Sequence, residues 1–196
     1  MDMSVPYKKA VHTYFGSRAK KIIAYDHFHI TKMLAEALDY IRKKELQAAP
    51  SIDRLYHHKT RFIWLQNKTN RDDYTNNQIT EQAGYLQKTA TAWFFKERFR
   101  EIWKYAKKGH KRLWQHWIEL VRATGLKPLI GVASTIEENL EGILNAQKYG
   151  VSNGRAEALN NNIKYLARRS RGYKNRERYK SAIWFNFGRL DLHPTH

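Results

Sequence analysis

Apolar residues recur every three or four positions through most of this 196-residue chain, and that spacing constrains its fold more than any other feature. Leu34, Leu38 and Ile41 share one face of a helix that we expect to begin near Thr31 and to end at Pro50. Later helices, each followed by a glycine, are expected over 78–108, 111–124 and 135–148. The middle of the chain is therefore predicted to be mostly helical.

Two segments depart from this helical pattern. Residues 19–26 form a short apolar run with two adjacent isoleucines that stops at an acid, so we expect a buried strand there. Residues 62–65 also look extended. An acid at a strand end is a common functional position, because the loop there is accessible. The alternative interpretation is that Asp26 caps the following helix, with His29 as its neighbour.

The composition points to a polyanionic partner. Lys and Arg number 36 against 18 Asp and Glu, which gives a formal net charge of +18. Nucleic acid is the first candidate for such a partner, and the alternatives are an anionic membrane surface or a charge that serves only solubility. No apolar run approaches the roughly 20 residues of a membrane span, and the N-terminus lacks a secretory signal. The chain has no Cys, which excludes disulfides, thiolate nucleophiles and Cys-based zinc sites. We therefore expect a cytoplasmic protein that does not span a membrane, and with nucleic acid as the preferred partner we expect no membrane partner.

Aromatic residues follow the expected central helices, with Lys and Arg between them. They are Trp93, Phe94, Phe95, Phe99, Trp103, Tyr105, Trp114 and Trp117. Core packing with solvated basic faces would explain this pattern. The alternative is that some of these rings stack on unpaired bases. The spacing alone does not decide between the two interpretations.

A polar stripe marks the helix expected after residue 151, for which Ser152 or Asn153 is a competent N-cap. Steps of three and four residues place five polar side chains on one face: Glu157, Asn160, Asn161, Lys164 and Arg168. An acid, two amides and two bases suit a metal ion bound beside a phosphodiester backbone. An ordinary capped surface helix is the alternative. From residue 150 onward, ten Lys and Arg face only three acids, so we expect this segment to bind DNA.

Four motifs occur in order along the chain. They are Met1-Asp-Met-Ser with Tyr7, Asp26-His-Phe-His29, Ser152-Asn-Gly-x-x-Glu157-x-x-Asn160-Asn, and Arg171-Gly-Tyr-Lys-Asn175. Together they resemble bacterial insertion-sequence transposases of the ISL3 type, over nearly the whole chain. The resemblance implies the C-terminal part of a ribonuclease-H-like α/β domain with an Asp-Asp-Glu triad, interrupted by a large helical insertion. The expected fold class is thus mostly α with a small β remnant.

The resemblance also implies three regions. Residues 1–30 would hold the end of the fourth strand, a helix and the fifth strand of the ribonuclease-H-like fold. Residues 31–150 would form the mostly helical insertion. Residues 151–196 would form the helix with the catalytic Glu and a basic tail.

Site residues follow from the same alignment of motifs. Asp2 and Glu157 would be catalytic acids and ligands of Mg²⁺ or Mn²⁺. Asp26 and His29 resemble the Asp-x-x-His signature of related transposases and form an alternative or supporting acid motif. DNA would be held by Asn160, Asn161, Lys164, Arg168, Arg169, Arg171 and Lys174.

The family's first catalytic Asp and its N-terminal DNA-binding regions would precede Met1. We therefore expect a transposase fragment that is inactive alone, whereas the parent enzyme would cleave and join DNA strands. Its partners would be transposon ends and target DNA, with a homo-oligomer as one allowed assembly. Its location would be the bacterial cytoplasm, in the nucleoid when it is bound to DNA. The alternative function is a non-catalytic basic DNA- or RNA-binding protein, or a truncated transposase that acts as a regulator.

Overall fold

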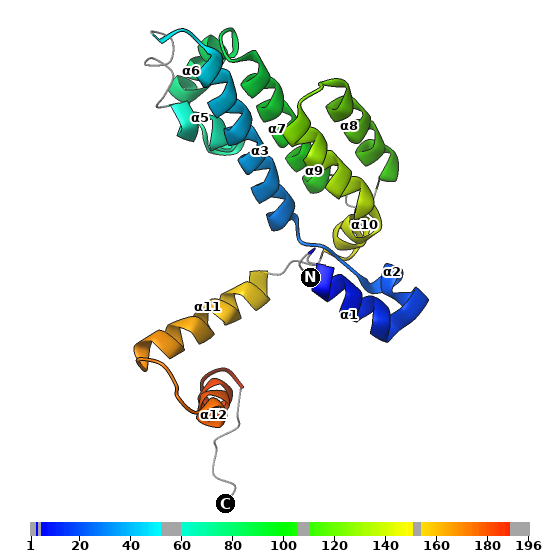
Figure 1. The fold of residues 1–196 in the computed structure, drawn as a ribbon, viewed down its shortest axis with the longest axis vertical. Helices are drawn as coiled ribbons and strands as arrows, with labels where there is room; N and C mark the ends of the chain where they lie inside the picture. The colour runs from blue at the N-terminus through cyan, green and yellow to red at the C-terminus, as the bar shows by residue number, and fades with distance from the viewer. Residues whose placement is uncertain (1–2, 4, 52–59, 106–109, 151–153, 189–196) are drawn as a thin grey trace, which may run out of the picture. The chain divides into compact units, whose positions relative to one another are not determined.

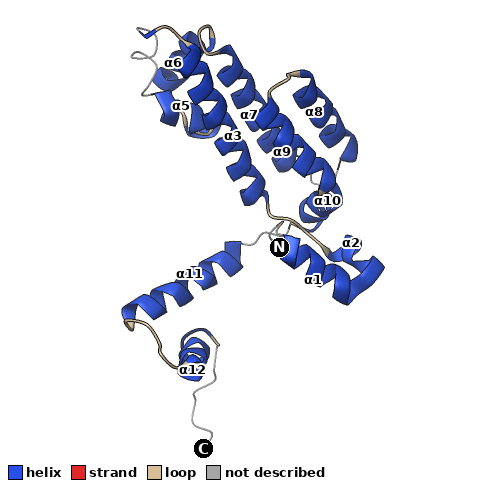
Figure 2. Ribbon diagram, viewed as in Figure 1, coloured by secondary structure: helices blue, strands red, loops and turns tan. Residues whose placement is uncertain are grey.

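The computed structural model describes residues 3, 5–51, 60–105, 110–150 and 154–188, and these are almost entirely helical (Figure 1). Figure 2 shows no strand in the part of the chain that is described. The expectation of a mostly α protein is therefore confirmed. The chain divides into two compact units, Met1–Ser152 and Asn153–His196.

The first unit contains nine described α-helices and two 3-10 turns, η1 (Gly16–Arg18) and η3 (Lys68–Asn70). The helices are α1 (Val5–Phe15), α2 (Ala19–Ile22), α3 (His27–Ala48), α5 (Arg61–Leu65), α6 (Asp73–Ala83), α7 (Gln87–Tyr105), α8 (Lys111–Ala123), α9 (Lys127–Glu138) and α10 (Leu140–Tyr149). The second unit contains α11 (Gly154–Arg169) and α12 (Arg176–Phe187).

The main core of the first unit lies between α3, α7, α8 and α9, which Figure 1 shows side by side. Phe99 is fully buried, and its ring centroid lies 5.2 Å from that of Trp114. Phe95 contacts Trp117 edge-on at 6.0 Å. Core packing is thus confirmed for these four aromatic residues. Other members of the aromatic set are exposed: Phe94 and Tyr105.

A buried amide joins three helices of this core. The indole nitrogen of Trp114 in α8 donates to Oε1 of Gln147 in α10 at 2.8 Å. The amide nitrogen of Gln147 donates in turn to the carbonyl of Ile102 in α7 at 3.1 Å. These bonds satisfy the polar atoms that burial would otherwise leave without water.

A buried carboxylate connects α3 to α5. Oδ1 of Asp39 accepts hydrogen bonds from Arg42 at 2.9 and 3.1 Å. Oδ2 of Asp39 lies 3.0 Å from Nζ of Lys43 and 3.4 Å from Nε of Arg61. Burial raises the pKa of Asp39, but the hydrogen bonds and charges of Arg42 and Lys43 outweigh it and leave the pKa lowered. Asp39 is therefore an ionised structural residue.

The expectation of a strand over 19–26 is wrong. The expected β remnant is therefore also wrong for the residues that the structure describes. Ala19–Ile22 is the short helix α2, and the chain is extended only after it. Ile23 and Tyr25 are buried as expected for a strand, but they pack against α10 instead of a sheet. The expectation of extended chain over 62–65 is also wrong, because these residues belong to α5.

The expected helix boundaries are correct in some places and wrong in others. The helices at 31–50 and 111–124 correspond to α3 and α8. The helix expected over 78–108 is two helices, α6 and α7, and the one over 135–148 includes parts of α9 and α10.

Candidate functional site

Asp26 lies at the start of α3 and caps it. Its Oδ1 accepts the backbone N–H of Phe28 at 3.2 Å and lies 3.0 Å from Nδ1 of His27. The residue is only 5 % exposed. The alternative interpretation of Asp26 as a helix cap is therefore confirmed. His29, the other member of the motif, lies in the first turn of α3 with its ring edge-on to Phe28 at 5.8 Å.

The segment before Asp26 is held by α10. The backbone N–H of Tyr25 donates to the carbonyl of Gly142 at 3.1 Å, and the Tyr25 ring lies against the Cα of this glycine. The side-chain amide of Asn145 donates to the carbonyls of Lys20 at 3.0 Å and Ile23 at 2.8 Å. These contacts satisfy the carbonyls at the end of α2 and fix the backbone that leads to Asp26.

We expect Gly142→Ala to lower the free energy of unfolding by about 1–3 kcal/mol, the usual range for overpacking. A Cβ at this position would overlap Cδ2 and Cε2 of the buried Tyr25 ring and lie 3.2 Å from Cγ2 of Ile23. Urea denaturation followed by circular dichroism measures the change. Gly131→Ala in α9 is the matched control, because a Cβ there meets nothing within 4 Å. That control should be neutral or stabilising by up to about 1 kcal/mol; equal effects at both glycines would contradict the close approach.

A pocket of about 440 Å³ is lined by His27, the residue that follows Asp26. Its walls are the first turn of α3, the η3 turn and the C-terminal half of α7. His27, which contacts Asp26, also lies against the Trp103 ring, with 5.5 Å between the ring centroids. Three basic residues line the pocket: Lys68, Arg100 and Lys104. In the sequence, Trp103 stands out only as one of the aromatic residues, and no motif marks the three basic ones.

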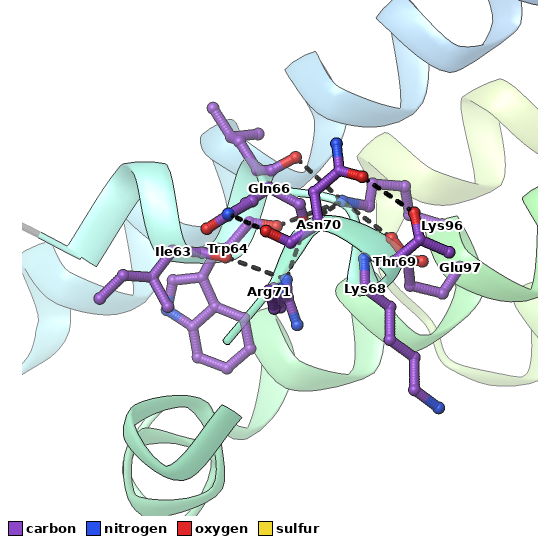
Figure 3. Close-up of polar contacts among 10 residues, drawn as sticks. Ile63, Trp64, Gln66, Lys68, Thr69, Asn70, Arg71, Lys96 and Glu97 are labelled. Atoms are coloured by element: carbon purple, nitrogen blue, oxygen red, sulfur yellow. Dashed lines mark hydrogen bonds and ion pairs between the residues drawn. The ribbon is translucent and has the colours of Figure 1, made fainter. Parts of the chain in front are cut away.

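A buried cation, Lys96, and a half-buried one, Arg71, hold the η3 wall of this pocket in place (Figure 3). The ammonium of Lys96, 2 % exposed, donates to the carbonyls of Trp64 at 3.3 Å and Leu65 at 3.2 Å, which end α5. The guanidinium of Arg71 donates to Gln66 at 2.7 Å and lies 4.5 Å over the Trp93 ring. The side chains thus satisfy carbonyls that the end of a helix leaves without an internal partner.

In the second unit, α11 carries the predicted polar face. The backbone of Glu157 lies within this helix, whereas its side chain lies outside the described part of the structure. Asn160, Lys164 and Arg168 are four residues apart, share one face and are exposed. Further predicted DNA contacts are also exposed: Asn161, Arg169, Arg171 and Lys174. All of these side chains are therefore accessible to a large ligand.

The Arg-Gly-Tyr-Lys-Asn motif forms the turn between α11 and α12. Arg171 and Gly172 have φ values of +54° and +90°, a region that favours glycine. The ring of Tyr173 stacks on Tyr179 at 4.9 Å, and Asn175 caps α12 by accepting two backbone N–H groups. The motif thus has a structural basis, because it fixes the geometry of a turn that exposes basic side chains.

The two predicted catalytic acids belong to different units of the chain. Asp2 lies outside the described residues, and Glu157 belongs to the other unit. Among the residues that are described, no group of three or more His, Asp or Glu side chains is placed to hold a metal ion. None of the described helices is long and apolar enough to cross a membrane.

Comparison with known proteins gives one family. The sequence model of the ISL3-type DDE transposases, described as transposase, matches residues 1–183. The transposase for insertion sequence element IS1001 of Bordetella parapertussis is 26 % identical over 183 residues, which cover 90 % of this chain and 44 % of that relative. The chain therefore spans less than half the length of this curated relative. No solved structure matches the chain.

Proposed function

Because this chain belongs to the ISL3-type family of DDE transposases, we propose that it acts in DNA-mediated transposition, as part of the machinery that cleaves and joins DNA strands. The observation that carries this proposal is the family match over residues 1–183. Its DNA partners would be transposon ends and target DNA, met in the bacterial nucleoid. A homo-oligomer is part of the proposal, since two transposon ends have to be joined to one target.

Asp2 and Glu157 are the proposed catalytic carboxylates, placed within a ribonuclease-H-like arrangement. Carboxylate oxygens are the ligands that Mg²⁺ prefers, and Mn²⁺ accepts the same ligands. A divalent ion held there would stabilise negative charge that develops on the phosphodiester. Asp26 has a different role in this proposal, because its carboxylate already caps α3 and contacts His27.

The exposed basic residues of the second unit would position the DNA backbone. Lys164 and Arg168 lie one turn apart on α11, and Arg171 and Lys174 extend from the turn that follows. Long cationic side chains with free access to solvent contact phosphates without reading the bases. Asn160 precedes Lys164 by one turn and would add an amide donor to the same phosphate track.

We expect binding to duplex DNA of arbitrary sequence to weaken steeply with salt. If about five phosphates are neutralised, log K falls against log salt with a slope of roughly −4 to −5, because each contact releases condensed counterions. The double variant Lys164→Gln, Arg168→Gln should reduce the size of this slope by about 2. Fluorescence anisotropy between 50 and 200 mM salt, a range over which such slopes are about linear, measures it. Affinity that stays flat over this range would contradict the proposed DNA contacts.

A transposition assay with a donor that carries the element's ends tests the catalytic assignment, with this chain joined to the upstream half of the parent transposase because the chain alone is expected to be inactive. Glu157→Gln is expected to reduce transposition to background while leaving DNA binding intact. Asp26→Asn is the matched control, because Asn caps helices about as well as Asp and the variant should keep most of the activity. Activity that survives Glu157→Gln but is lost in Asp26→Asn would show that Asp26 is the catalytic acid. DNA binding without cleavage by the chain joined to its upstream half would instead favour the alternative function, a non-catalytic DNA-binding regulator.

A further inference from the structure

The pocket between α3, η3 and α7 has a cationic lining that the family match does not assign. Arg100 and Lys104 are one turn apart on α7, and Lys68 faces the same space from η3. The opposite wall holds Thr31, and Asn67 lies beside Lys68. A pocket of about 440 Å³ with these groups offers both charge and hydrogen-bond donors to a ligand of modest size.

The two acids on the walls of this pocket are already paired. Glu101 accepts a hydrogen bond from Arg98 at 2.9 Å. Glu97 pairs with the buried Lys96 at 3.2 Å, and its second oxygen accepts the backbone N–H of Lys68 at 3.4 Å. Their negative charge is therefore largely balanced by groups other than the three lining cations.

The three lining cations form no ion pair with any of the described residues. Nη1 of Arg100 is buried and has no hydrogen-bond partner in the described part of the structure. A buried guanidinium donor without a partner costs free energy, so the site gains if a ligand supplies an acceptor. Lys104 and Lys68 are exposed and add charge at the pocket rim.

We propose that this pocket binds a phosphodiester group of the DNA backbone, with Arg100 donating from inside and Lys68 and Lys104 from the rim. The inference rests on the proposed function, because it takes DNA as the ligand. A bidentate guanidinium suits phosphate oxygens, and the ring wall of Trp103 and His27 would contact the adjoining sugar. The helical part of the first unit then contacts DNA independently of α11.

Three single variants of the full chain test the pocket against a matched control on the same helix. Each of three variants should make the negative slope of log K against log salt less steep by about 1 and weaken duplex binding about three- to tenfold. The variants are Lys68→Gln, Lys104→Gln and Arg100→Gln. Lys88→Gln removes the same charge at the other end of α7, outside the pocket, and should change the slope far less. Equal effects at Lys88 and Lys104 would show a general charge effect and would overturn the proposal.

A fourth variant covers the case in which Arg100→Gln disturbs folding. Glu101→Gln removes negative charge from the pocket wall, so DNA affinity should rise, which a structural defect would not produce. Inorganic phosphate at constant ionic strength should compete with DNA for the pocket. Phosphate binding that shifts the Trp103 indole NMR signal, combined with an unchanged DNA slope in all pocket variants, would make this a site for free anions and overturn the proposal.

The outcomes also separate this inference from the proposed function. If the unmodified chain shows no salt-dependent DNA binding, the proposed function fails first. If it binds DNA and the Lys164 and Arg168 variant reduces the slope while the pocket variants do not, only the pocket proposal fails.

Discussion

Lys96→Met is expected to lower the free energy of unfolding of the Met1–Ser152 unit by about 3–5 kcal/mol, the usual cost of removing one member of a buried ion pair. The ammonium of Lys96 contacts Glu97 at 3.2 Å and donates to carbonyls at the end of α5. Methionine fills the same space but leaves the carboxylate and these carbonyls without their donor. Urea denaturation followed by circular dichroism measures the loss.

Lys88→Met is the control, because Lys88 is an exposed residue on the same helix, α7. Such a surface change usually stays within about 0.5 kcal/mol. The double variant Lys96→Met, Glu97→Gln should recover part of the loss, since it leaves no unpaired charge. A loss at Lys96 no larger than that at Lys88 would show that the ammonium contributes little to the stability of the unit.

The stability difference between the unmodified chain and Lys96→Met should also depend on pH. Burial lowers the pKa of Lys96 in the folded chain, and Glu97 offsets this only in part. Between that lowered pKa and the ordinary value of 10.5, the unfolded chain therefore binds more protons than the folded chain. The contribution of Lys96 to the free energy of unfolding therefore rises with pH through this interval. The difference in free energy of unfolding between the unmodified chain and Lys96→Met should accordingly grow toward pH 10.5. A gap that narrows over the same interval would contradict the direction of the pKa shift.

Trp114→Ala is expected to cost about 3–5 kcal/mol, the range for removing a large aromatic side chain from a core. Trp114 is fully buried, and its ring centroid lies 5.2 Å from that of Phe99. Its indole nitrogen donates a hydrogen bond to Oε1 of Gln147 at 2.8 Å. The variant therefore opens a cavity between α7, α8 and α10 and leaves a buried amide oxygen without its donor. Thermal and urea unfolding of the first unit both report the change.

Trp184→Ala is the matched control, since Trp184 in α12 is 65 % exposed. Its effect on unfolding of the first unit should stay within about 0.5 kcal/mol. Similar losses for the two tryptophans would contradict the placement of Trp114 in the core. Trp114→Phe should fall between the two, because it keeps a ring but loses the indole donor.

Helical periodicity predicted α3 and α8 because their apolar residues are local signals along the chain. The division of 78–108 into α6 and α7 could not be predicted in this way. The first turn of α7 is capped by Glu45 from α3, which accepts the N–H groups of Lys88 at 2.9 Å and Thr89 at 2.8 Å. A cap supplied from about 40 residues away leaves no trace in the sequence around the helix start.

The prediction of a strand over 19–26 is wrong because the packing partner of this segment is also distant in the sequence. A short apolar run indicates burial without indicating the partner, and here the partner is a helix with a glycine at the contact, Gly142. The exposed polar face of α11 was predictable, because its spacing is helical and its composition is almost wholly polar. The cationic pocket was not, since Lys68 and Arg100 meet only when η3 packs against α7.

The helix pair α11 and α12 has no buried residue among those that are described, in contrast to the first unit. Helices of 16 and 12 residues without a core are close to the length at which isolated helices are marginal in water. Within the pair, the turn at Gly172 and the Tyr173–Tyr179 stack connect the two helices. Phosphates along the basic face would remove the repulsion between its cations and favour the helical state. If α11 binds DNA as proposed above, DNA binding and ordering of the helix that carries Glu157 are thermodynamically linked, and the side chain of this residue takes a fixed orientation mainly when DNA is bound.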